Sequence, residues 1–259
     1  MKFKRFFSQI YLTLIFIFLY APIAVLIVFS FNSGKGSRFD GFSLRWYEEL
    51  FQSEMILDAL WNTLFIAVTS ALIATIIGLI SCIGISALKG KPKAVYMALN
   101  NIPMLNSELV TGLSLMLVFA AFGLTAGYPT ILIAHITFNI PYVILSIMPR
   151  LRQTNKSTYE AAIDLGASPT YAFYKVVLPE LMPGIFSGFL LAFTMSLDDF
   201  IITYFTRGAG INTLSTLIYS EVRKGIKPTI NALSTIMFVS VLLLLFFINR
   251  PKKATNEIL

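Results

Sequence analysis

The sequence predicts an all-α membrane protein with six transmembrane helices, and three observations support this fold class. Of the 259 residues, 56% are hydrophobic and only 13% are charged, about half the charged share of a soluble domain. Long apolar runs and 23 Phe residues indicate that the bilayer surrounds most of the chain. At about 20 residues per crossing, the length allows six spans with short connections and leaves no room for a soluble catalytic domain. We therefore expect one transmembrane domain over residues 1–259.

Six apolar runs give the expected spans. The first follows Lys2, Lys4 and Arg5 like the core of a signal peptide, but it is longer than a cleavable core and no A-x-A site follows it. We therefore expect it to remain as a span. Two starting points fit the third run: Pro103, or a position near Ala94 with a break at Pro103. The expected spans cover about residues 10–31, 63–88, 103–124, 129–148, 183–205 and 229–249.

The basic residues predict how the chain crosses the membrane. The net charge is +7, and most Lys and Arg residues lie at the ends of apolar runs, so topology explains them better than a nucleic-acid partner does. With both termini in the cytoplasm, 13 of the 20 basic residues lie inside and 7 outside. Because cytoplasmic loops carry the excess of Lys and Arg, we expect both termini and the 149–182 loop to be cytoplasmic. The outer loop 206–228 opposes this bias, because it carries four of the seven basic residues placed outside. Part of this loop is expected to fold back against the bundle.

Small residues recur at every fourth position in two of the runs. They are Ser70, Ala74, Gly78, Cys82 and Ser86 in the second run, and Gly184, Gly188, Ala192 and Ser196 in the fifth. Such stripes let helix backbones approach closely inside a bilayer, so they predict a packed bundle. The only cysteine is Cys82, which excludes an internal disulfide and a multi-cysteine metal site. We expect no metal.

The connection 149–182 is polar, yet its sequence is typical of folded structure. Residues 155–165 fit a short helix, and Gly166 suits the left-handed residue that ends such a helix. Ser168-Pro169 is an N-cap followed by Pro in the first helical turn. A second short helix is expected to follow and to be closed by Pro179. Helix, glycine turn and helix together would form a rigid docking element.

Part of this connection has the letters of a known motif. Glu160-Ala161-Ala162, Gly166, Val176 and Leu178-Pro179 stand at the spacing of E-A-A-x3-G-x9-I-x-L-P, with Val in place of Ile. This resembles the signature of permease subunits of bacterial ATP-binding cassette (ABC) importers. The resemblance implies a type I importer permease fold with a cytoplasmic coupling helix that docks on a separate ATPase. The residues implied in this docking are Glu160, Ala161, Ala162, Gly166, Ser168, Pro169, Leu178 and Pro179.

The sequence has no G-x-x-x-x-G-K-[ST] phosphate-binding loop. ATP and Mg²⁺ would then be bound by the partner ATPase, and this chain would be no enzyme and would hold no cofactor. Further segments resemble the PotC-type permease of spermidine/putrescine (polyamine) importers, and the resemblance covers nearly the whole chain. It implies ABC ATPase subunits, a second homologous permease and an extracytoplasmic solute-binding protein as partners, in the lipid of the bacterial inner membrane. The segments are 20–23, 30–32, 46–47, 135–138, 196–199 and 231–235.

Asp198 and Asp199 are the main candidates for residues that face the substrate path. A carboxylate inside a bilayer costs about 2.5–3.5 kcal/mol or more and usually faces an interior or a water path. At about 100° per residue, Asp199 falls on the small-residue stripe and should face packed helices, while Asp198 lies about 100° further round. The alternative is a pair at the helix end that is solvated or bonded to Arg207. For Glu108, a place on the path and one at the interface are equally open.

Aromatic residues and the single histidine give further candidates. Tyr204 and Tyr219 could supply cation–π contacts, although aromatic residues are common at membrane interfaces. His135 is interpreted as a hydrogen-bonded packing residue. The alternatives to a polyamine importer are a permease for another small solute and an ion-coupled secondary transporter, although the internal repeats typical of such transporters are not evident. An intramembrane aspartic protease is disfavoured because Asp198 and Asp199 are adjacent and point apart.

Overall fold

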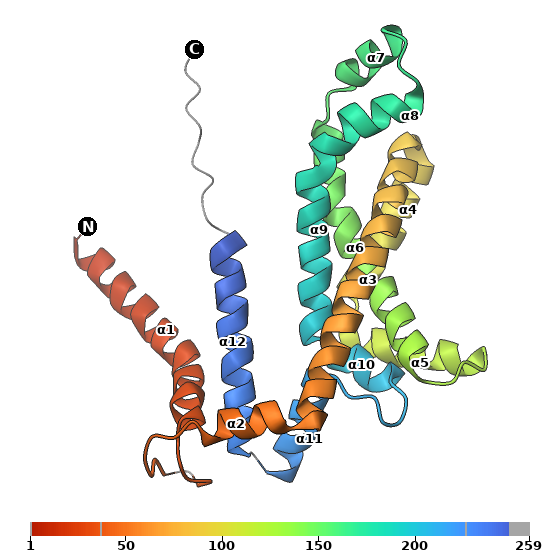
Figure 1. Ribbon diagram of the computed structural model, residues 1–259. Coiled ribbons are helices and arrows are strands. Elements are labelled where there is room, and N and C mark those ends of the chain that lie inside the picture. Colours follow the sequence, from red (N-terminus) through yellow and green to blue (C-terminus); the bar gives the residue numbers. More distant parts are fainter. Residues whose placement is uncertain (1, 37, 226, 249–259) are drawn as a thin grey trace. The chain divides into compact units, whose positions relative to one another are not determined.

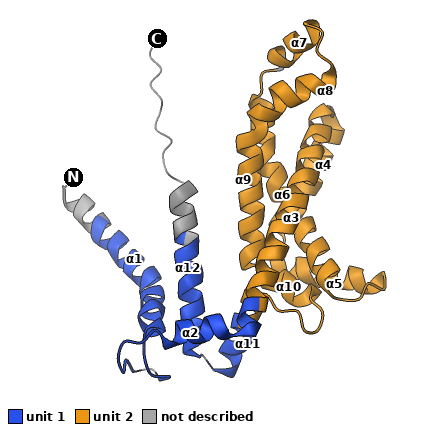
Figure 2. Cartoon of the chain, in the orientation of Figure 1, with its two compact units in different colours: residues 1–57, 218–259 blue, residues 58–217 orange. Residues whose placement is uncertain are grey.

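The computed structural model describes residues 2–36, 38–225 and 227–248 (Figure 1). Every regular element in these ranges is a helix, and the only β pairing among them is an isolated bridge between Asn32 and Phe42. The predicted all-α class is therefore confirmed. The chain divides into two compact units (Figure 2): unit 1 comprises residues 1–57 and 218–259, and unit 2 comprises residues 58–217.

Unit 1 is built from helices of both ends of the chain. They are α1 (Lys2–Ser30), α2 (Arg45–Gln52), most of α11 (Leu214–Lys224) and α12 (Pro228–Ile248). α1 packs against α12, and α12 packs against α2. The amphipathic α2 buries Trp46 and Leu50, and Nε1 of Trp46 donates to the Asn32 carbonyl at 2.5 Å. This bond ties α2 to the loop that follows α1.

The basic residues at the end of α11 have partners within unit 1. The carboxylate of Glu221 is buried and lies 2.8 Å from Nζ of Lys227 and 3.0 Å from Nζ of Lys224. Hydrogen bonds from Lys227 and then from Lys224 hold the pKa of Glu221 below its usual value. The guanidinium of Arg223 lies 5.5 Å from the centre of the Tyr219 ring. The charges that oppose the topological bias are therefore paired with a carboxylate or stacked on a ring.

Unit 2 is built around three long helices: α3 (Glu54–Ala87), α6 (Tyr128–Gln153) and α9 (Leu178–Asp198). Its other elements are α4 (Gly90–Leu105), α5 (Glu108–Ala121), α7 (Lys156–Asp164), α8 (Pro169–Ala172), the π-helical turn η1 (Phe173–Val177) and α10 (Ile201–Thr206). α7 and α8 lie at one end of this unit and α10 at the other (Figure 1).

Four helices among the described residues are long and apolar enough to cross a membrane: Gln9–Ser30, Glu54–Ala87, Tyr128–Gln153 and the helical stretch Pro169–Asp198. The pair α4 and α5, bent by 106°, would make a fifth span. The run expected at 103–124 is thus two helices, and the break follows Leu105 because Ser107 caps α5 by accepting from the Leu109 N–H at 3.2 Å. α12 has 21 residues and covers the sixth expected run except residue 249, which lies outside the described ranges.

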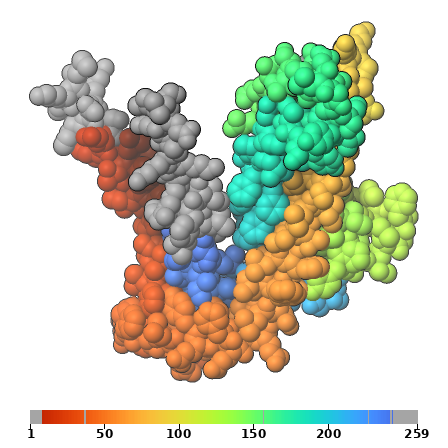
Figure 3. Space-filling view, turned by 45° about the horizontal axis from the view of Figure 1, so that its top comes forward, coloured from red at the N-terminus to blue at the C-terminus, as the bar shows by residue number. Residues whose placement is uncertain are grey.

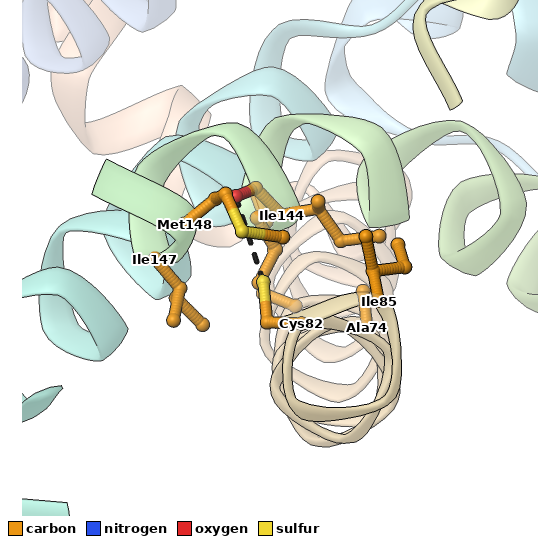
Figure 4. Packing of buried hydrophobic residues seen from close by; sticks show 9 residues of the cluster. Ala74, Cys82, Ile85, Ile144, Ile147 and Met148 are labelled. Carbon is orange, nitrogen blue, oxygen red and sulfur yellow. Dashed lines mark hydrogen bonds between the residues drawn. The ribbon is translucent and has the colours of Figure 1, made fainter. Parts of the chain in front are cut away.

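Residues of both small-residue stripes contact α6. An ideal Cβ on Gly78 of α3 would lie 2.5 Å from Cγ1 of Val143, and one on Gly188 of α9 would lie 3.4 Å from the same atom. Cys82 is fully buried beside Ile144 (Figure 4), and its thiol donates to the Ile144 carbonyl at 3.6 Å. The predicted close packing in a bundle is therefore confirmed, with α6 as the partner that α3 and α9 share.

Candidate functional site

The chain turns sharply between α9 and α10. α9 ends at Asp198, and Asp199 has extended backbone (φ −59°, ψ 128°). The carboxylate of Asp199 then caps α10: Oδ1 accepts from the Ile202 N–H at 3.3 Å, and Oδ2 accepts from the Thr203 N–H at 2.8 Å. The hydroxyl of Thr203 also donates to Oδ2, at 2.8 Å. The run expected as one span at 183–205 is therefore interrupted, because the Asp199 side chain satisfies the first N–H groups of a new helix.

The two adjacent aspartates have different surroundings. Asp199 is 9% exposed, whereas Asp198 is exposed. Asp199 therefore faces packed helices, as its helical position predicts. The alternative was a pair at the helix end that is solvated or bonded to Arg207. Its first part agrees with Asp198, which is the last residue of α9 and is exposed. Its second part is not observed among the described ion pairs, since Arg207 donates within its own loop, for example to the Ile211 carbonyl at 3.1 Å.

A cavity of about 330 Å³ in unit 2 brings together all three acidic candidates. Glu108 reaches it from the first turn of α5, and the aspartates reach it from the turn between α9 and α10. Aromatic rings of α6 and of this turn form part of the wall. The lining residues are Pro103, Asn106, Glu108, Thr111, Phe138, Tyr142, Met195, Asp198, Asp199, Phe200, Ile201 and Ile202.

Direct packing of α5 on α10 places Glu108 in this cavity. Gly112 lies one helical turn after Glu108 on α5. An ideal Cβ on Gly112 would lie 3.2 Å from the Phe205 ring and 3.3 Å from the Cα of Ile202. Because a side chain at this position would force the helices apart, the glycine allows the close approach that brings Glu108 toward the aspartates.

The cavity is anionic. Glu108 and Asp198 are both exposed, and neither is among the ion pairs within 4 Å that the described residues form. Phe138, Tyr142 and Phe200 supply aromatic surface next to these carboxylates. Carboxylates attract cations directly, and the faces of aromatic rings attract them through their quadrupoles. The arrangement is therefore suited to a cation that also carries apolar segments.

The two tyrosine candidates do not line this cavity. The ring of Tyr204 has the Arg207 guanidinium 5.7 Å from its centre and borders a second, more open hollow of about 520 Å³. Tyr219 belongs to unit 1, where Arg223 lies over its ring. Arginine thus occupies one face of each ring.

His135 is buried and hydrogen-bonded, as predicted. Its Nδ1 lies 2.5 Å from Oγ of Ser196, and its Nε2 lies 2.9 Å from Oγ1 of Thr203. Sequence reasoning missed Thr203 and the rings of Phe138 and Tyr142, since no spacing in the sequence links them to the aspartates. In the ranges that the structure describes, no group of three or more His, Cys, Asp or Glu side chains could hold a metal ion.

The 149–182 connection forms the helix, glycine turn and helix that its sequence predicts. The side chain of Asn155 caps α7 by accepting from the Ser157 N–H at 3.0 Å. Gly166 ends this helix in the left-handed region with φ +88°, and the Ala167 N–H donates to the Ala162 carbonyl at 3.0 Å, as in a Schellman motif. Ser168 then caps α8.

The end of the second helix differs from the prediction. Pro179 does not close it, because α8 passes through the π-helical turn η1 into α9, and Pro179 lies in the first turn of α9. In a regular α-helix, the Pro179 ring would clash with the carbonyl of Lys175, and the N–H that bonds this carbonyl would be missing. The wider turn, in which the Leu178 N–H donates to the Phe173 carbonyl, accommodates the proline without a break.

Much of the motif surface is accessible in this structure. Figure 3 shows α7 and α8 as a continuous surface at one end of unit 2. Six of the eight predicted docking residues are exposed, whereas Ala162 and Leu178 are half-buried. The exposed ones are Glu160, Ala161, Gly166, Ser168, Pro169 and Pro179. Leu165 is 89% exposed. Sequence reasoning missed Leu165, although an apolar residue beside the glycine turn of a polar helix could have drawn attention to it.

Comparisons with known proteins agree with this geometry. The family model "Binding-protein-dependent transport system inner membrane component" matches residues 74–250. The chain is 41% identical over 236 residues to the putrescine transport system permease protein PotI of Escherichia coli, covering 87% of this chain and 83% of PotI. It is 36% identical over 238 residues to the spermidine/putrescine transport system permease protein PotC of Haemophilus influenzae, covering 91% and 93%.

A solved structure has the same fold. It is a bacterial ABC transporter involved in the import of the acidic polysaccharide alginate, with a TM-score of 0.70, 16% identity, and coverage of 96% of this chain and 97% of that one. The resemblance to ABC importer permeases inferred from the motif is thus confirmed. The relatives are transport permeases and not enzymes. The chain therefore belongs to the binding-protein-dependent transport system inner membrane component family.

Proposed function

We propose that the chain is the membrane-spanning permease of an ATP-driven importer and that it passes polyamines such as putrescine and spermidine across the inner membrane. The relatives PotI and PotC are named for these solutes. Within this chain, the supporting observation is the cavity of unit 2, where Glu108 and Asp198 present unpaired carboxylates from separate segments beside three aromatic rings.

The chemistry of the cavity suits a polyamine. Amines of this kind are protonated at neutral pH, so a polyamine carries ammonium groups separated by methylene segments. Glu108 and Asp198 would each oppose one ammonium group, and Phe138, Tyr142 and Phe200 would cover the methylene segment between them. A neutral solute would leave both carboxylates unpaired, and an anion would be repelled. Asp199 would maintain the shape of the site, since its oxygens already accept bonds from α10.

The 149–182 connection would couple this path to ATP hydrolysis. We place it in the cytoplasm, where a partner ATPase that binds ATP and Mg²⁺ would dock on Glu160, Leu165 and the turn at Gly166. Because the helix runs without a break from α8 to Asp198, a rotation imposed on α8 would reach the cavity directly. The same proposal includes six spans in one transmembrane domain, both termini in the cytoplasm, a second permease and an extracytoplasmic binding protein.

Uptake of radiolabelled spermidine and putrescine by the complete importer, co-expressed with its partner subunits, tests this function. Asp198→Asn and Glu108→Gln should each lower uptake roughly ten- to a hundredfold, the range for one lost charge-assisted hydrogen bond. Asp58→Asn is the control, since it removes an exposed carboxylate of α3 that does not line the cavity.

Two results would contradict the proposal. One is normal uptake in both cavity variants at equal amounts of assembled complex; the other is an equal loss in the Asp58 control. If the wild-type importer carries another small solute but no polyamine, the permease role stands and the substrate assignment is wrong.

A further inference from the structure

Buried hydrogen bonds join four helices of unit 2 and end at Asp199. Oγ of Ser70 on α3 lies 3.1 Å from Oγ of Ser196 on α9, which lies 2.5 Å from Nδ1 of His135 on α6. Nε2 of His135 lies 2.9 Å from Oγ1 of Thr203 on α10, and that hydroxyl donates to Asp199 at 2.8 Å. All five residues are at most 9% exposed. Each of these residues thus has a hydrogen-bond partner within the series.

The donors along this series can be assigned from the hydrogens that each group carries. Thr203 has a single hydroxyl hydrogen, which it donates to the Asp199 carboxylate. Nε2 of His135 must therefore carry the hydrogen of its bond to Thr203. In a neutral imidazole, Nδ1 then accepts from Ser196. His135 is thus the donor that directs the Thr203 hydroxyl toward Asp199, and its Nε2 also lies 3.5 Å from Oδ2 of Asp199.

Asp199 transmits this constraint to α10, because its carboxylate caps the first turn of that helix. Both unpaired carboxylates of the cavity depend on α10. Asp198 immediately precedes the turn into α10, and Glu108 lies one helical turn from Gly112, where α5 packs directly on α10. A shift of α10 would therefore change the separation between the two carboxylates.

We propose that His135 is a positioning residue for the substrate path: through Thr203 and Asp199 it holds α10, and α10 holds Asp198 and Glu108 at the separation that a cationic substrate requires. This inference rests on the proposed function, since the separation matters only if the substrate meets these carboxylates. It requires no change in the protonation of His135. Bulk packing alone would not depend on the donor at Nε2.

Two pairs of variants separate hydrogen bonding from packing. His135→Leu removes the donor to Thr203, whereas His135→Gln keeps an N–H donor near the position of Nε2. Thr203→Val replaces the hydroxyl by a methyl group of similar shape, whereas Thr203→Ser keeps the hydroxyl. We expect Leu and Val to lower spermidine uptake per assembled importer about five- to tenfold, and Gln and Ser to restore most of it. Equal uptake within each pair would overturn the inference. If the His135→Leu importer does not assemble, the comparison of Thr203→Val with Thr203→Ser decides the question.

A double mutant tests whether His135 acts through Asp198. If it does, adding His135→Leu to Asp198→Asn should change uptake by less than about twofold, since interacting sites are not additive. A full multiplicative loss would assign His135 to general packing and would overturn the inference. Failure of the proposed function would be distinct: Asp198→Asn alone would then transport like the wild type.

Discussion

Replacing Gly166 by Val perturbs the turn between α7 and α8 through the backbone alone. Gly166 has φ +88°, a conformation that residues with a side chain rarely adopt, and no atom lies within 4 Å of an ideal Cβ built on it. Beyond the two adjacent residues, a Cβ at this position would therefore lie in open space. The left-handed conformation costs a residue with a Cβ roughly 1–2 kcal/mol, and a β-branched residue at this φ is a clear outlier.

This strain should reduce transport without preventing insertion. About 1.4 kcal/mol is a factor of ten in an equilibrium, so the share of chains with the observed turn would fall roughly five- to thirtyfold relative to conformers that relax it. Because the proposed docking residues Glu160 and Leu165 lie just before the turn and α8 just after it, a relaxed turn would misalign them. We expect polyamine uptake to fall by a similar factor at normal levels of protein in the membrane.

Uptake and ATPase copurification in three variants would check this reasoning. Gly166→Asn should be milder, since Asn tolerates the left-handed region better than Val. Gly90→Val is the matched control, because Gly90 also has positive φ (+62°) and open space but lies outside the motif. Normal uptake in Gly166→Val, or an equal loss in Gly90→Val, would refute the proposed role of this turn.

Two further predictions concern topology and the π-helical turn. Single cysteines introduced at Ser33 and Ser157, in a Cys82→Ala background, should react with a membrane-impermeant thiol reagent from opposite sides of the membrane. The reason is that the charge bias places their loops on opposite sides. Reaction from the same side would contradict the topology. Pro179→Ala restores a backbone N–H, so η1 can tighten into a regular α-helix and rotate α7 and α8 by about 100° relative to α9. Uptake should then fall at unchanged expression, and normal uptake would show that the π turn does not set the docking direction.

The structure of the 149–182 connection could be predicted because its determinants are local. The caps at Asn155 and Ser168 and the left-handed Gly166 depend on residues only a few positions away. Pro179 was the exception. A proline either ends a helix or is accommodated by a wider turn, and the choice depends on how the flanking helices pack, which the sequence pattern does not contain.

The acidic pair could be predicted in part. Helical periodicity correctly assigned Asp199 to the packed side and left Asp198 exposed. The cause of the burial was different from the one expected, because α9 has already ended and Asp199 is held by capping α10. Periodicity describes positions within one helix and cannot predict that a side chain will cap the first turn of the next helix.

The sequence by itself determined the membrane environment, the helical class, the permease motif of the 149–182 connection and the list of acidic candidates, because composition and short-range spacing suffice for each. Only the tertiary structure decided that Glu108 joins Asp198 in one cavity and that His135 reaches Asp199 through Thr203. Glu108 and Asp198 are 90 positions apart in the chain, and His135 and Asp199 are 64 apart. Their proximity depends on the bend after Leu105, the turn after Asp198 and the close approach at Gly112, all of which are properties of packed helices and not of any sequence interval.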